Sequence, residues 1–152
     1  FHLVLNGLAG IILGWTVFPV ILVALSLQFL FFNYGGILCL PVNTANMALP
    51  AILSYYIFRK FIILQGRRKN FRTALAAFFC GAFAIFASAL MTSSSLFLSD
   101  PFYANAARIF FIANIPLMLI EGFATSVITV FLCETKPEIF LFFTGEKNAA
   151  IM

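Results

Sequence analysis

Residues 59–72 read RKFIILQGRRKNFR and hold six of the nine lysine and arginine residues in the chain. The 58 residues before them contain no aspartate, glutamate, lysine or arginine. A water-soluble domain carries charges throughout its surface, whereas a lipid-embedded segment excludes them and leaves them to the adjacent loops. This contrast predicts an integral membrane protein in which residues 62–72 form a cytoplasmic loop.

The composition supports the same class. Hydrophobic residues make up 63% of the 152-residue chain and charged residues 9%, with a mean hydropathy of +1.08. These values fit an all-α polytopic membrane protein, and the alternating pattern of a β-barrel is not visible. The net charge of +4 is concentrated in one loop, so it indicates membrane orientation rather than nucleic-acid binding. We expect residues 1–152 to form a single domain in the lipid bilayer.

About five transmembrane helices are predicted. The first apolar run would reach about 45 Å as a single helix, against a bilayer core of about 30 Å. Gly14 and Pro19 mark a break within it, because proline is favoured in the first turn of a helix and costly in its interior. The predicted helices therefore cover residues 3–14, 17–32, 43–61, 72–92 and 106–132. Asn43 would cap the third helix, and the serine-rich segment 92–95 would end the fourth.

The basic loop also predicts the orientation of the other segments. With residues 62–72 in the cytoplasm, loops 33–42 and 93–104 lie outside, and the tail after residue 134 lies in the cytoplasm. His2 is then at the extracytoplasmic end, provided that the chain breaks near residue 15. A single tilted helix over residues 3–32 would instead place His2 in the cytoplasm. The location is the plasma membrane, or the inner membrane of a two-membrane cell.

Several polar residues are predicted to share the outer half of the membrane. His2 and Asn6 are spaced i, i+4 on one helical face, and Asn43 and Asn46 are spaced i, i+3. Buried amides need partners in lipid, so these side chains should point inward. An imidazole in such a cavity suits Co²⁺ or Ni²⁺. The alternative is that His2 is a hydrogen-bonded bystander, and one histidine alone does not make a metal site.

Glu121 is predicted to lie in the middle of the last helix, with twelve uncharged residues on either side. A carboxyl group at this depth is a functional candidate, and we expect a structural or coupling role, away from His2. Gly7, Gly10 and Gly14 form a small-residue face that predicts close internal helix packing.

The cysteines and the rest of the sequence show no recognisable metal-binding or catalytic motif. Three cysteines, Cys39, Cys80 and Cys133, are expected to be buried free thiols. No nucleotide-binding loop, nucleophile elbow or carboxylate pair is found, so we predict that the chain cannot hydrolyse ATP itself.

The order and spacing of several motifs resemble the CbiM/NikM family. The similarity covers nearly the whole chain and is carried by residues 2–10 with Gly14, 18–25 with Gln28, Gly35-Gly36, 42–48, Glu121-Gly122 and 136–139. The chain departs from the family at Pro41, where glycine is common. The family's Met-His start is also absent, so the chain resembles roughly the C-terminal two-thirds of a longer protein.

This resemblance implies transport. Members of the family are the substrate-capture subunits of energy-coupling-factor importers for cobalt and nickel, and their fold is the helical bundle of such subunits. The family's metal-ligating histidine matches His2, with Asn6, Asn43 and Asn46 bracing the site. Co²⁺ or Ni²⁺ would be the transported substrate. The Asn-Thr-x-Asn-Met motif at residues 43–47 resembles that of the cobalt branch of the family, which serves cobalamin biosynthesis. The implied partners are a transmembrane coupling subunit, cytoplasmic ATPase subunits and a small accessory membrane subunit.

Three other functions remain open at this stage. The chain could capture an organic, vitamin-like solute, in which case His2 would be dispensable. It could be an intramembrane enzyme that uses His2 or Glu121, although no second acid, base or nucleophile is near either. It could also be a purely structural subunit, in which changes at Asn43 or Asn46 would affect stability alone.

Overall fold

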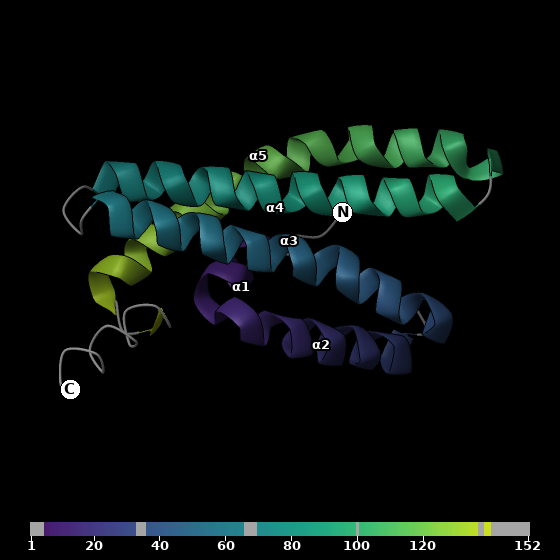
Figure 1. The fold of residues 1–152 in the computed structure, drawn as a ribbon, viewed down its shortest axis with the longest axis horizontal. Helices are drawn as coiled ribbons and strands as arrows, with labels where there is room; N and C mark the ends of the chain where they lie inside the picture. Colours follow the sequence, from purple (N-terminus) through teal and green to yellow (C-terminus); the bar gives the residue numbers. More distant parts are fainter. Residues whose placement is uncertain (1–4, 33–35, 66–69, 100, 137–138, 141–152) are drawn as a thin grey trace.

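The computed structural model describes residues 5–32, 36–65, 70–99, 101–136 and 139–140. The elements within these ranges are helical: α1 (Asn6–Leu13), the 3₁₀ turn η1 (Gly14–Thr16), α2 (Val17–Phe32), α3 (Gly36–Gln65), α4 (Asn70–Ser99), the 3₁₀ turn η2 (Pro101–Tyr103) and α5 (Ala104–Thr135). Helix α4 packs against both α3 and α5, while α1 contacts all three and α2 contacts α3 (Figure 1). The predicted all-α class is confirmed.

Within the described ranges, four segments are long and apolar enough to cross a membrane: Asn6–Phe32, Gly36–Ile62, Phe71–Ser99 and Ala104–Thr135. The prediction of about five spans was therefore one too many. Helix α1 has eight residues and reaches only about 12 Å, which is less than half of the hydrocarbon core.

The predicted break in the first apolar run is confirmed. Gly14 has φ +55°, in the left-handed region that favours glycine, and Pro19 lies in the first turn of α2. Gly10 and Gly14 pack on Ala51 and Tyr55 of α3, so α1 runs in the same direction as α3. Helix α2 then runs back along α3 in the opposite direction (Figure 1). The break is thus a reversal of the chain.

The long helices extend beyond their predicted ends. Helix α3 begins at Gly36, so Asn43 lies inside the helix and the predicted N-cap was wrong. Helix α4 continues through the serine-rich segment to Ser99. The hydroxyls of Ser94, Ser95 and Ser99 donate to carbonyl oxygens four residues earlier, at 2.8, 2.9 and 2.8 Å. Because these hydroxyls are satisfied along the helix, they do not end it.

Glycines allow α1 to approach its neighbours closely. A Cβ atom at Gly7 would lie 2.6 Å from the Cα of Gly81 on α4, and one at Gly10 would lie 2.0 Å from the carbonyl oxygen of Ala51 on α3. Both distances are shorter than real Cβ contacts, so only glycine fits. The predicted small-residue face is confirmed as internal packing, and it holds α1 against α3 and α4.

We predict that Gly10→Val destabilises the fold by at least about 1–3 kcal/mol, because the added carbons overlap the α3 backbone. The measurement is the thermal unfolding midpoint of the purified protein in detergent. Ala24→Val is the matched control, since Ala24 is exposed on α2. Equal midpoints for the two variants would contradict the close approach of α1 and α3.

Candidate polar site in the membrane interior

The start of α1 is bound to the middle of α5. The backbone N–H of Leu5 donates a hydrogen bond to Oε1 of Glu121 at 3.0 Å, across 116 residues of sequence. Glu121 is fully buried, and Leu5 is the described non-glycine residue with a positive φ, +53°. This conformation is uncommon for leucine. The carboxyl group therefore holds the chain in an unusual geometry where α1 begins.

This contact lies near the middle of the apolar segment Ala104–Thr135, which is long enough to cross a membrane. Glu121 is 13 residues after Arg108 and 13 residues before Glu134, about 20 Å along the helix from each. The sequence predicted that Glu121 lies in the middle of the last helix, and Glu121 does lie near the middle of α5. The expectation that Glu121 lies away from His2 stays a prediction, although Glu121 does bind the backbone of Leu5, three residues after His2. His2 itself lies outside the described residues.

The amide of Asn6 binds the other side of this junction. Asn6 is buried, and its Nδ2 donates to the carbonyl oxygen of Met47 on α3 at 3.3 Å. The adjacent Asn46 is also buried, and its Nδ2 lies 3.5 Å from Oγ of Ser95 on α4. Asn43 is half-buried one turn earlier on α3. The start of α1 is thus bound by Glu121 of α5 through Leu5 and by the Met47 carbonyl of α3 through Asn6, while Asn46 bonds separately to α4.

A polar face on α5 was missed by the sequence analysis. Glu121, Thr125 and Thr129 recur every four residues, and all three are fully buried. Within the described part of the chain, the hydroxyls of Thr125 and Thr129 have no hydrogen-bond partner. Gly81 lies close against Thr125, in the position of a weak Cα–H···O contact. The i, i+4 spacing was the available signal for this face.

Among the described residues, no three histidine, cysteine, aspartate or glutamate side chains come together. All three cysteines are free thiols, with Cys80 buried and Cys133 half-buried. Cys39 is exposed, so the expectation that it is buried was wrong. The N-terminal part of α3, where Cys39 lies, has less of the bundle around it than the sequence suggested.

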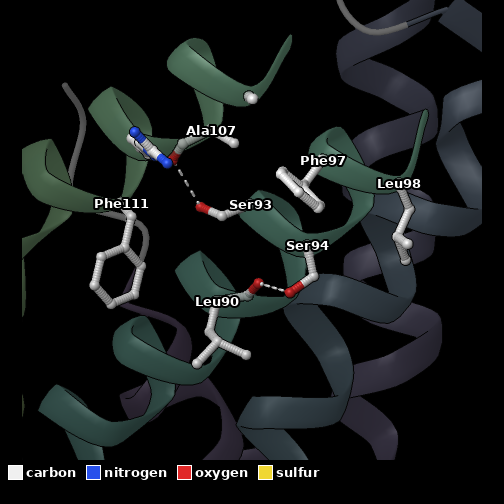
Figure 2. Close-up of a pocket in the computed structure, with 9 residues that line it drawn as sticks. Leu90, Ser93, Ser94, Phe97, Leu98, Ala107 and Phe111 are labelled. Atoms are coloured by element: carbon white, nitrogen blue, oxygen red, sulfur yellow. Dashed lines mark hydrogen bonds between the residues drawn. The ribbon is translucent and has the colours of Figure 1, made fainter. Parts of the chain in front are cut away.

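A separate groove of about 440 Å³ opens between the ends of α4 and α5. Its lining includes Ser93, Ser94, Phe97 and Leu98 of α4 and Ala107 and Phe111 of α5, and Figure 2 shows Ser93 pointing towards Ala107. Arg108 also lines the groove, whereas the buried cluster around Leu5 does not.

The apolar spans, the chain reversal after α1 and the buried polar cluster define a polytopic α-helical membrane protein with a polar site in its interior. The family model for the "Cobalt uptake substrate-specific transmembrane region" matches residues 1–139. The chain belongs to this family, CbiM, and the resemblance seen in the sequence is confirmed.

Individual relatives agree with the family. A Haemophilus influenzae protein, provisionally named a metal transport protein, is 33% identical over 139 residues, which are 91% of this chain and 66% of the relative. "Cobalt transport protein CbiM" of Geobacter sulfurreducens is 32% identical over 88% of this chain and 40% of its own length. The Sorangium cellulosum protein of the same name is 29% identical, over 88% and 61%. The chain thus spans less than two-thirds of each, and no solved structure matches it.

We predict that Glu121→Leu lowers the free energy of unfolding by about 1–3 kcal/mol, because the Leu5 N–H loses its buried acceptor. Glu121→Gln keeps an acceptor oxygen and is expected to lose much less. Thermal unfolding in detergent measures both, with Glu134→Leu as a control at the exposed end of α5. If glutamine were as damaging as leucine, the bond to Leu5 would not be the source of the stability.

Proposed function

We propose that the complete protein is the membrane-embedded substrate-binding subunit of a cobalt importer of the energy-coupling-factor type. The observation that carries this proposal is the match to a cobalt-uptake region over residues 1–139. This range includes His2 and all the residues of the buried cluster. The transported substrate is Co²⁺, and the protein catalyses no chemical reaction.

His2 is the proposed ligand on this chain, and it binds the metal through a neutral imidazole nitrogen. One histidine does not make a metal site, so at least two more ligands are needed besides His2. The buried cluster supports this role because Glu121 fixes Leu5 and Met47 binds Asn6, three and four residues after His2. A chain segment that is already held by two neighbouring helices loses less conformational entropy when it binds an ion. Asn43 and Asn46 brace the same region from α3.

The position of the cluster also suits transport. Transporter sites commonly form near the bilayer midplane, where a discontinuous helix begins or ends. Helix α1 is such a half-length helix, and it begins beside Glu121. The metal enters this region from the extracytoplasmic side. Its release to the cytoplasm is coupled to the partner subunits through the packed helices α1, α4 and α5.

The energy for transport comes from other proteins. The sequence contains no nucleotide-binding loop, so ATP hydrolysis is assigned to separate cytoplasmic ATPase subunits. A transmembrane coupling subunit connects them to this chain, and a small accessory membrane subunit completes the importer. These partners follow the pattern implied by the resemblance to the CbiM/NikM family.

We predict that the complete protein binds Co²⁺ and that His2→Ala abolishes this binding. Isothermal titration calorimetry in detergent measures it, with Ni²⁺ titrated in parallel to compare the two metals. Asn46→Leu is expected to weaken binding by about tenfold, as is typical when a supporting residue is lost. Unchanged binding in a folded His2→Ala variant would contradict the metal site and favour an organic solute, and tighter Ni²⁺ binding would assign a nickel importer.

The orientation gives a separate prediction. The basic loop should face the cytoplasm and Ser99, at the end of α4, the outside. In a cysteine-free background, a membrane-impermeant maleimide applied to intact cells should label Ser99→Cys and leave Arg67→Cys unlabelled. Both variants should react after the cells are opened, which controls for accessibility. The reverse pattern in intact cells would overturn the orientation.

A further inference from the structure

The groove between α4 and α5 has two chemically different parts. Its walls are largely apolar and include Leu90, Phe97 and Phe111, while Arg108 supplies a positive charge. Phe97 and Leu98 are exposed, at 59% and 83%. The groove lies between two segments that are apolar enough to span a membrane, Phe71–Ser99 and Ala104–Thr135. It therefore opens towards lipid.

The serine hydroxyls in the groove are already engaged. Ser93 Oγ donates to the carbonyl oxygen of Ala107 at 3.2 Å, and Ser94 Oγ donates to that of Leu90 at 2.8 Å (Figure 2). These bonds use the single proton of each hydroxyl. The Arg108 guanidinium is therefore the strong donor that the groove offers to a ligand.

Arg108 has no counter-ion within the described part of the chain. It is exposed, and its guanidinium makes no hydrogen bond or ion pair with another described residue. The described acidic residues of α5, Glu121 and Glu134, lie 13 and 26 residues further along the helix. A cation at the edge of a membrane-spanning helix is stabilised by an anion at the same depth.

The depth of Arg108 corresponds to the lipid headgroups. Glu134 lies 26 positions after Arg108, which corresponds to about 39 Å along α5. A bilayer measures about 40–45 Å when its headgroup regions are included. If Glu134 lies at one surface, Arg108 reaches the headgroup level of the other. A phosphate at that level could meet the guanidinium while its acyl chains lie along the apolar walls.

We infer that this groove binds an anionic phospholipid. The lipid phosphate contacts Arg108, and one acyl chain packs on Leu90, Phe97 and Phe111. A zwitterionic lipid carries the same phosphate but adds a positive group beside it, which the Arg108 guanidinium repels, so the site favours a lipid with a net negative charge. This inference does not depend on the transported substrate, so it stands or falls separately from the proposed function.

The test compares phosphatidylglycerol with phosphatidylcholine of the same acyl chains. Native mass spectrometry of the delipidated complete protein, incubated with an equimolar mixture, measures which lipid remains bound. We expect the wild-type protein to retain phosphatidylglycerol preferentially, and Arg108→Gln to reduce that preference by about fivefold, as expected for one basic side chain at a charged surface. The matched control is Arg72→Gln, because Arg72 is also exposed near a helix start but lies outside the groove.

Two further variants make the test independent of one substitution. Ser94→Trp fills the groove without removing the charge, and it is expected to reduce the binding of both lipids. Asp100→Asn removes the carboxyl group nearest to Arg108 in sequence on the N-terminal side, and it should leave the preference unchanged or increase it. Equal retention of the two lipids by the wild-type protein would overturn the inference. So would an equal loss of preference in Arg72→Gln, or full preference in folded Arg108→Gln.

Discussion

The hydrogen bond between Glu121 and the Leu5 N–H is the constraint on which the arrangement of the membrane interior depends. A buried carboxyl group is costly unless it is hydrogen-bonded, and here its Oε1 satisfies a backbone donor at the start of a helix. That donor could not find water in the middle of a bilayer. The bond thus allows α1 to begin in the membrane interior, where most membrane helices could not begin.

The glycines make this geometry sterically possible. Gly7 brings α1 against Gly81 of α4, and a Cβ at Gly81 would in turn lie 3.1 Å from the carbonyl oxygen of Glu121. Helices α1, α4 and α5 therefore meet where Glu121 and Leu5 are joined. Asn6 adds a bond to α3 at the same level. The result is a rigid frame on three sides of the segment that follows His2.

The sequence predicted the features that depend on local patterns. Charge distribution and hydropathy gave the membrane class, and Gly14 with Pro19 gave the reversal of the chain. Helix ends were harder to predict, because Ser94, Ser95 and Ser99 bond to their own helix instead of ending it. The bond from Leu5 to Glu121 spans 116 residues, so no local pattern could predict it. His2, the central candidate, was singled out as a polar residue beside an uncharged apolar run and then by the family resemblance, and it stays a prediction.

The most direct test of the account is the position of the metal in the complete protein. Anomalous diffraction at the cobalt absorption edge, from crystals grown with Co²⁺, locates the ion without assumptions about its ligands. We expect one strong peak bonded to the His2 imidazole, at the segment held by Glu121 and Met47. A strong peak elsewhere in the bundle, with His2 unligated, would contradict it.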